Sequence, residues 1–278
     1  MARTTAVPDE RVASSDTRPA CRVRRGEGGR WEEEEVAGEF PLTLVVNGEE
    51  MATLVCSPSH LEELVLGFLT AEGVLRRGER IERLFVDVED GIAHVDAPDR
   101  QDAMEQEMFG MRYVGSCCGK SRTGFYFAND ARTAREVTSG LTVTSDDCFR
   151  LMEELQDASP LFGRTGGVHN AGLATVDGVE VVRTDIGRHN TLDKLYGHAL
   201  REEVALEDRL VVFSGRISSE IALKLSKMGC PVLVSKSAPT ALALSMADDL
   251  GITTAGFTRG GRMNVYTHPE RIRDLPER

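Results

Sequence analysis

The sequence predicts an α/β protein in which a smaller β-rich domain precedes a larger domain of alternating strands and helices. Two observations support this prediction. Over residues 209–267, short and fully apolar runs alternate with helical segments, which is typical of parallel strands covered by helices. Over residues 40–96, strand-like runs are joined by tight Asn-Gly and Asp-Gly turns, which is typical of hairpins.

Composition divides the 278 residues into three parts. Residues 1–28 are rich in Arg, Ser, Asp and Gly without a hydrophobic period, so we expect a disordered tail. Residues 29–140 are expected to form the β-rich N-terminal domain, which ends in a loop holding Cys117 and Cys118. Residues 141–278 are expected to form the α/β domain, where the chemistry discussed below predicts a ligand site.

In the N-terminal domain, residues 40–56 predict a hairpin because two β-rich runs meet at Asn47-Gly48, the strongest short turn signal. An amphipathic helix follows, and Ser59 with Glu62 is expected to form a capping box at its start. Residues 83–97 predict a second hairpin, which turns at an Asp-Gly pair.

The second domain is expected to begin with a helix capped by Thr144 or Ser145 and to continue with a hairpin over residues 171–184. A turn then leads into a further helix. After it, strands and helices alternate, with Gly229 ending one helix and Pro239 opening the next. The apolar strands of this part are expected over residues 209–215, 231–237 and 253–260.

The charge of the chain excludes two classes of partner. The formal net charge is −12, and the acidic excess lies in residues 1–110, which hold 12 basic and 24 acidic side chains. The field of an acidic protein repels polyanions, so we expect neither nucleic acid nor an anionic membrane surface as a partner. No apolar run is long enough to span a bilayer, and the first residues lack the apolar segment of a secretory signal, so we expect a cytoplasmic protein.

Polar, glycine-rich clusters recur at the ends of the strands predicted in the second domain. Because ligands of open α/β sheets bind at the carboxyl ends of strands, we expect these clusters to line one edge. Ser218 or Ser219 and Thr240 stand at helix N-termini, where unpaired N–H groups attract anions. The clusters therefore predict a site for a phosphorylated or otherwise anionic ligand, although none is a phosphate loop of a known type. They span residues 164–170, 185–190, 214–220, 235–240 and 258–264, and their cations are Arg164, Arg188, Arg216, Lys236, Arg259 and Arg262.

Two histidines and two aspartates in these clusters each allow two interpretations. His169 and His189 each precede an asparagine. In one interpretation the histidine has a functional role and contacts a ligand or acts as an acid or base, and in the other it is purely structural. Asp185 and Asp193 are expected to order a neighbouring basic side chain, and a catalytic role for either is the weaker interpretation. The basic side chains in question are Arg188 and Lys194.

Cys117 and Cys118 differ in their surroundings from the other four cysteines. They lie in YVGSCCGKSRTG, where glycines free the backbone and Lys120 and Arg122 lower the pKa of a nearby thiol. This setting predicts an accessible, reactive thiol that can carry sulfur as a persulfide. A Cys-His-Asn hydrolase is an alternative function for such a thiol. A metal site is not expected, because two adjacent cysteines supply too few ligands. The remaining cysteines are expected to be small buried hydrophobes at Cys56, Cys148 and Cys230 and incidental at Cys21.

Five motifs, in this order, resemble those of the FdhD/NarQ family over residues 38–268. They are GSCCGKSR, RTGGVHNAGL, DIGRHNTLDK, SGRISSEI with KSAPT, and GFTRGGRMNVYT. The resemblance implies a sulfurtransferase that takes sulfur from a cysteine desulfurase as a cysteine persulfide. It further implies transfer of this sulfur to the molybdenum or tungsten bis(guanylyl-molybdopterin) cofactor, Mo-bis(molybdopterin guanine dinucleotide), before insertion into the formate dehydrogenase apoenzyme. A homodimer and a C-terminal cytidine-deaminase-like α/β/α fold without the deaminase zinc motif are also implied.

The resemblance assigns roles to individual residues. Many members carry two cysteines separated by two residues, whereas here they are adjacent. Alignment on the C-G-K end matches Cys118 to the second family cysteine and Gly115 to the first, whereas a short gap matches Cys117 to the first. We expect Cys117 to carry the persulfide and Cys118 to assist. The alternative to a sulfurtransferase is a non-catalytic chaperone that only holds the cofactor during maturation of formate dehydrogenase. The family's cofactor-binding stretch matches Phe257, Thr258, Arg259, Gly260, Gly261 and Arg262, and no directly bound metal ion is expected.

Overall fold

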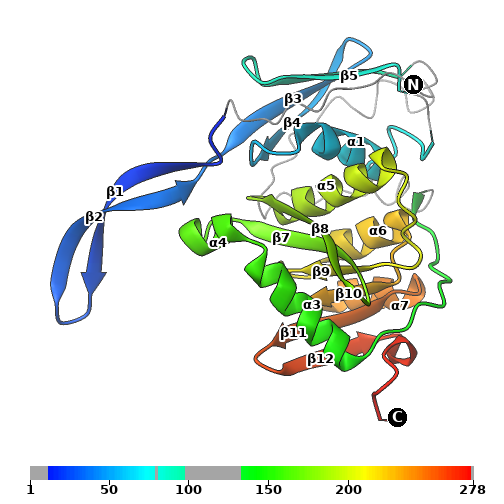
Figure 1. The fold of residues 1–278 in the computed structure, drawn as a ribbon. Helices are drawn as coiled ribbons and strands as arrows, with labels where there is room; N and C mark the ends of the chain where they lie inside the picture. Colours follow the sequence, from blue (N-terminus) through cyan, green and yellow to red (C-terminus); the bar gives the residue numbers. More distant parts are fainter. Residues whose placement is uncertain (1–11, 79–80, 98–132, 277–278) are drawn as a thin grey trace.

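The computed structural model of the chain describes residues 12–78, 81–97 and 133–276, which form three sheets (Figure 1). One is a four-stranded sheet in the order β4-β3-β6-β5, against which α1 packs. Asn47 and Gly48 between β3 and β4 both have positive φ, as the predicted two-residue turn requires. The elements are β3 (Phe40–Val46), β4 (Glu49–Cys56), α1 (Leu61–Ala71), β5 (Arg83–Asp87) and β6 (Ile92–Asp96).

The largest sheet has six strands in the order β12-β11-β10-β9-β7-β8. β9, β10 and β11 are parallel neighbours, while β7 and β12 run antiparallel to the strand beside them. The strands are β7 (His169–Thr175), β8 (Gly178–Asp185), β9 (Leu210–Phe213), β10 (Val232–Ser235), β11 (Thr253–Arg259) and β12 (Arg262–Thr267).

Helices cover both faces of the six-stranded sheet, which confirms the α/β prediction and its three α/β/α layers (Figure 1). Along β9, Val211 and Phe213 pack in the core formed with α5, α6 and α7, whereas Leu210 and Val212 pack in the core formed with α3. The helices are α3 (Ser145–Asp157), α4 (Pro160–Thr165), α5 (Arg188–Arg201), α6 (Ser219–Met228), α7 (Ala241–Asp249) and the short 3-10 turn η2 (Pro269–Arg271). None of the helices within the described ranges is long and apolar enough to cross a membrane.

The first two strands form a hairpin that extends away from the rest of the molecule (Figure 1). β1 (Ser15–Arg24) pairs with β2 (Gly28–Ala37) along its whole length, so the expectation of a disordered tail is wrong for these residues. Composition alone suggested the tail, but the two strands pair throughout, and ion pairs form between them, with Arg22 of β1 2.6 Å from Glu32 of β2. Residues 1–11 lie outside the described part of the chain.

Helix ends in the second domain largely follow the predicted chemistry. Thr144 caps α3, and its side chain and that of Asp147 exchange hydrogen bonds with each other's backbone N–H groups in a capping box. Gly229 ends α6 in the left-handed conformation that glycine adopts readily. Pro239 does not open α7, because the helix begins two residues later with Thr240 as its cap.

The start of α1 differs from the prediction. Its first residue follows His60, which has a left-handed backbone and makes no side-chain capping hydrogen bond. The capping box of Ser59 and Glu62 is therefore wrong. The Ser59 N–H instead donates to the Ser57 carbonyl, so the chain makes a tight turn before the helix.

α1 and α5 cross in close contact and join the four-stranded sheet to the six-stranded one. Gly67 and Gly197 lie at the crossing, where an added Cβ would stand 1.8 Å from the carbonyl oxygens of Asp193 and Glu63 respectively. Only glycine lets the two backbones approach this closely. The crossing therefore fixes how the N-terminal elements sit on the α/β domain.

Candidate functional site

The polar clusters of the second domain meet at one edge of the six-stranded sheet, as predicted. β9, β10 and β11 run parallel, so the clusters that follow them, at 214–220, 235–240 and 258–264, lie at the same edge. β7 is antiparallel to β9, so the cluster at 164–170, which precedes β7, lies there too. The first residue of β7 pairs with the last residue of β8, so the cluster at 185–190, which begins at the end of β8, lies at the same edge. We call this the carboxyl edge.

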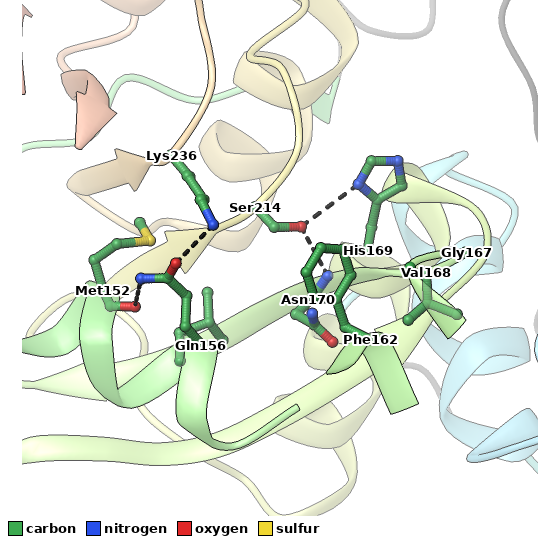
Figure 2. A pocket seen from close by; sticks show the side chains of 11 residues that line it. Met152, Gln156, Phe162, Gly167, Val168, His169, Asn170, Ser214 and Lys236 are labelled. Atoms are coloured by element: carbon green, nitrogen blue, oxygen red, sulfur yellow. Dashed lines mark hydrogen bonds between the residues drawn. The ribbon is translucent and has the colours of Figure 1, made fainter. Parts of the chain in front are cut away.

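A pocket of about 290 Å³ opens at the carboxyl edge, between α3, α4 and the ends of β7, β9 and β10 (Figure 2). Its lining combines a largely apolar wall with a few polar side chains, which is typical of sites for small molecules. The apolar side chains are Met152, Leu155, Phe162 and Val168, and the polar ones are Gln156, His169, Asn170, Ser214 and Lys236.

Two polar side chains of the pocket are already fixed by neighbouring groups. Asn170 Oδ1 accepts hydrogen bonds of 2.7 Å from the hydroxyls of Ser159 and Thr184. Ser214 Oγ accepts a 2.9 Å hydrogen bond from the Asn170 N–H and lies 3.5 Å from His169 Nδ1 (Figure 2). Side chains held in this way lose little further freedom when a ligand binds, so this wall of the pocket is pre-organised.

The two histidines named from the sequence both lie at the carboxyl edge. Burial and the positive charge of Arg188 hold the pKa of His169 below its ordinary value of 6.5. Its ring is therefore neutral at neutral pH, with one nitrogen as donor and the other as acceptor. His189 Nε2 lies 2.9 Å from Glu220 Oε2 at the start of α6. Whether either ring contacts a ligand or moves a proton stays a prediction.

Asp185 anchors the loop between β8 and α5. Its carboxylate lies 2.6 Å from Lys194 Nζ, and both side chains are fully buried. It also accepts a hydrogen bond from the Ser57 N–H, which ties the carboxyl edge to the end of β4. The predicted ordering of Lys194 by Asp185 is confirmed. Asp193 instead pairs with Lys224, at 2.5 Å.

The predicted cofactor-binding stretch forms the hairpin between β11 and β12. Gly260 and Gly261 both have positive φ and open space where a Cβ would stand, as a tight turn requires. Arg259 and Arg262 pair directly across this turn, and both are exposed. Like charges directly opposite each other destabilise a strand pair. An anion bound between the two arginines would remove this repulsion.

Residues beside the turn carry further signs of a ligand. The Phe257 N–H donates to the Ser237 carbonyl, and the Arg259 guanidinium lies 5.9 Å from the Phe257 ring centre, so the stretch packs on the neighbouring loop. The hydroxyls of Thr258 and Ser218 are buried and have no hydrogen-bond partner among the described residues. A buried hydroxyl without a partner costs free energy. Both hydroxyls are therefore available to bond to a ligand at this edge.

The predicted cations have different surroundings in the structure. Arg164 Nε lies 2.9 Å from both carboxylate oxygens of Glu35 on β2, so its charge is paired at the base of the β1–β2 hairpin. Lys236 Nζ donates to Gln156 Oε1 at 2.6 Å and lines the pocket (Figure 2). Arg216 is exposed at the end of β9.

Cys117 and Cys118 lie outside the described residues, so their catalytic assignment stays a prediction. Cys56, Cys148 and Cys230 are buried, as predicted. Burial raises the pKa of both the Cys148 and the Cys230 thiol to about 12, which leaves almost no thiolate at neutral pH. These three positions therefore do not supply a reactive thiol. Over the part of the chain that is described, no group of three or more His, Cys, Asp or Glu side chains could hold a metal ion.

Four side chains of the pocket were not predicted as part of a site. Leu155 and Gln156 follow Met152 by three and four residues on α3 and so project from the same side of the helix, and Phe162 lies on α4. Helical spacing shows that the first three share a face. It does not show that this face covers the carboxyl edge, because that depends on how α3 packs on the sheet.

Comparisons with known proteins give the family. The model of the FdhD/NarQ family matches residues 37–273. The chain is 54% identical over 255 residues to the sulfur carrier protein FdhD of Geobacillus kaustophilus (strain HTA426), which covers 92% of this chain and 96% of that protein. It is 49% identical over 257 residues to the sulfur carrier protein FdhD of Bacillus subtilis (strain 168), with 92% and 97% covered.

A solved structure shows the same fold. A crystal structure from Desulfotalea psychrophila, described as that of a formate dehydrogenase accessory protein, superposes on this chain with a TM-score of 0.75 and 27% identity. The superposition covers 94% of this chain and 100% of the other. The family model and the relatives thus agree over most of the sequence, and the chain belongs to the FdhD/NarQ family.

Proposed function

We propose that the chain carries sulfur for the maturation of formate dehydrogenase. A cysteine desulfurase supplies the sulfur, Cys117 or Cys118 holds it as a persulfide, and the molybdenum cofactor receives it before insertion into the apoenzyme. The names of the relatives support this proposal, since they are sulfur carrier proteins. The description of the solved relative as a formate dehydrogenase accessory protein supports the same pathway.

The first step is an exchange between two cysteines. The thiolate of Cys117 attacks the outer sulfur of the donor's persulfide, a new S–S bond forms, and the donor cysteine leaves as a thiolate with the electron pair of the broken bond. Lys120 and Arg122 stabilise the attacking thiolate, and Cys118 assists as the adjacent thiol. Free thiols persist in a reducing compartment, so we place the reaction in the cytoplasm.

We propose further that the carboxyl edge binds the cofactor as cargo. The observation that carries this proposal is the pair Arg259 and Arg262, whose mutual repulsion a diphosphate of the guanine dinucleotide would remove. The buried hydroxyls of Ser218 and Thr258 would gain partners from the same ligand. The apolar wall of the pocket suits a flat ring, which Phe162 can stack against.

A chaperone that binds the cofactor without carrying sulfur is the second candidate, because the binding features of the carboxyl edge do not depend on Cys117 and Cys118. The test is formate dehydrogenase activity in cells whose own copy of the gene is replaced by a variant. A sulfur carrier with both cysteines changed to alanine leaves the enzyme inactive, whereas a chaperone so changed supports full activity. Cys21→Ala is the matched control, since Cys21 is exposed on β1. Full activity with the double variant would overturn the sulfur-carrier proposal.

The arginine pair provides a complementary test. Under both candidates, Arg259→Ala with Arg262→Ala weakens cofactor binding and maturation together. Normal maturation of formate dehydrogenase by that variant would contradict cofactor binding at the carboxyl edge. It would not contradict sulfur transfer by Cys117 or Cys118.

A further inference from the structure

The turn that leads from β8 into α5, residues 186–190, brings two basic side chains to the pocket at the carboxyl edge. Arg188 and His189 are the first two residues of α5. A Cβ at Gly215, just after β9, would stand 3.1 Å from the Arg188 Cβ, so this arginine lies against the loop that follows β9. After burial, which is the largest cause, interactions with Arg188 and His189 lower the pKa of His169, which lines the pocket. The position of the 186–190 turn therefore decides where both groups stand.

Asp185 holds this turn through both oxygens of its carboxylate. Oδ1 accepts hydrogen bonds of 2.8 Å from the Gly187 N–H and from Asn190 Nδ2. Oδ2 accepts a 3.0 Å hydrogen bond from the Ser57 N–H and lies 2.6 Å from Lys194 Nζ. The side chain of Asp185 is fully buried and each of its oxygens already has two donors, so it acts on a ligand only through the turn.

The end of β4 contacts the same turn. The Ile186 N–H donates to Ser57 Oγ at 3.1 Å, and Asn190 Nδ2 donates to the Val55 carbonyl at 3.0 Å. β4 belongs to the four-stranded sheet, whereas β8 belongs to the six-stranded one. The turn is therefore fixed from both sheets at once, and Asp185 bonds to both sides.

We propose that Asp185 is a positioning residue for anion binding at the carboxyl edge. Its carboxylate holds the 186–190 turn in the conformation that directs Arg188 and His189 at the phosphate groups of the bound cargo. A site whose groups are held in place before binding loses less freedom when the ligand arrives, which increases its affinity. The inference rests on the proposed binding of the cofactor at this edge, and it names the group that prepares the edge for binding.

Asp185→Asn provides the first test, with guanosine diphosphate as the probe. By charge alone, the loss of a carboxylate near the site would tighten the binding of an anion. Loss of the position of the turn weakens it instead, so the dissociation constant from calorimetric titration of the full chain should rise at least about 10-fold. An unchanged or lower dissociation constant overturns the proposal.

Asp193→Asn is the matched control, because Asp193 forms a second buried ion pair on the same helix. Its carboxylate lies 2.5 Å from Lys224 Nζ, so the change also leaves a buried lysine without its partner. This pair joins α5 to α6 and makes no contact with Asp185. The control should lower the unfolding temperature as Asp185→Asn does, but keep the dissociation constant within about twofold of the wild type. An equal rise in both variants would reflect lost stability alone and overturns the proposal.

A second variant moves the turn without changing a charge. The Cβ that Gly187→Ala adds would stand 2.8 Å from Asn190 Nδ2, and this amide is buried and bonded to both Asp185 and Val55. Either the turn shifts or these hydrogen bonds break, so the dissociation constant should again rise. Gly140→Ala is the control, because no atom lies within 4 Å of its Cβ position. Equal affinities of Gly187→Ala and the wild type overturn the proposal.

The wild type separates this inference from the proposed function. A wild-type chain that binds no guanosine diphosphate contradicts cofactor binding at the carboxyl edge, and the inference is overturned with it. A wild type that binds the nucleotide, beside an Asp185→Asn variant that binds it equally well, overturns the inference alone. The expected result is a wild type that binds, an Asp193→Asn variant that binds as well, and weaker binding by Asp185→Asn and Gly187→Ala.

Discussion

At the scale of single residues, Arg259 and Arg262 repel each other in the free protein but together attract an anion. Removing one of them should therefore stabilise the fold and weaken ligand binding. Arg262→Ala removes the repulsion, so we expect the free energy of unfolding to rise by a few tenths up to about 1 kcal/mol. The same change removes a charged donor, so the dissociation constant for guanosine diphosphate, a fragment of the proposed cargo, should rise at least about 10-fold. Thermal unfolding and calorimetric titration measure the two quantities.

The control for this prediction is Arg273→Ala, which removes an exposed arginine that follows η2 and should change neither quantity. An unchanged affinity in Arg262→Ala would contradict the anion site at the β11–β12 turn.

Thiol reactivity is a second property of single residues. Because burial raises the pKa of Cys148 and Cys230 to about 12, we expect iodoacetamide at pH 8 to leave both unmodified in the folded protein. Cys117 or Cys118 should be alkylated at least about 100-fold faster, as a thiolate beside cations is. Mass spectrometry of peptides after timed quenching gives the rates. Equal rates at all of these positions in the native protein would count against a reactive thiol at 117 or 118.

At the scale of elements, the crossing of α1 and α5 tolerates no added methyl group. Gly197→Ala puts a Cβ against the Glu63 carbonyl, so the two helices must separate, and we expect a loss of about 1–3 kcal/mol or more in the free energy of unfolding. Gly163→Ala is the matched control, because Gly163 also lies in a helix but has open space at the Cβ position. Urea unfolding compares the two variants. Equal stability would show that the crossing is looser than described.

Sequence patterns predicted those elements whose signals are local. The turn at Asn47-Gly48 and the cap at Thr144 depend on neighbouring residues, and both are confirmed. The gathering of five clusters at the carboxyl edge was also predictable, because parallel strands end at one edge of a sheet. The β1–β2 hairpin was missed because its stability comes from pairing between strands, such as Arg22 with Glu32, rather than from composition. The pocket wall at Phe162 was missed because it depends on packing.

At the scale of the whole molecule, an ion pair between α1 and β8 makes stability depend on pH. Burial alone raises the pKa of the Glu63 carboxyl, but Arg183, together with His60 and His198, outweighs it, so the pKa lies below its ordinary value of 4.5. A lowered pKa in the folded state stabilises the protein above the unfolded-state pKa, and this contribution is lost as the pH falls through the folded-state value. At pH 7 the Glu63→Gln variant should therefore have a lower free energy of unfolding than the wild type. Below about pH 4.5 the wild type should lose more of its free energy of unfolding than the variant does.

Urea unfolding at pH 7 and at a series of values below pH 4.5 tests this pH dependence. Glu27→Gln, at the exposed tip of the β1–β2 hairpin, is the control and should follow the wild type. Parallel pH profiles for Glu63→Gln and the wild type would show that the ion pair does not contribute to acid sensitivity.

The central claim is that this chain carries sulfur on Cys117 or Cys118. The most direct measurement is intact-protein and peptide mass spectrometry after incubation of the full chain with a cysteine desulfurase and cysteine. We predict that the peptide holding Cys117 and Cys118 gains the mass of one sulfur atom, that a reducing agent removes it, and that the peptides of Cys21, Cys56, Cys148 and Cys230 stay unchanged. A chain that gains no sulfur, or that gains it equally when both Cys117 and Cys118 are alanine, would contradict the claim.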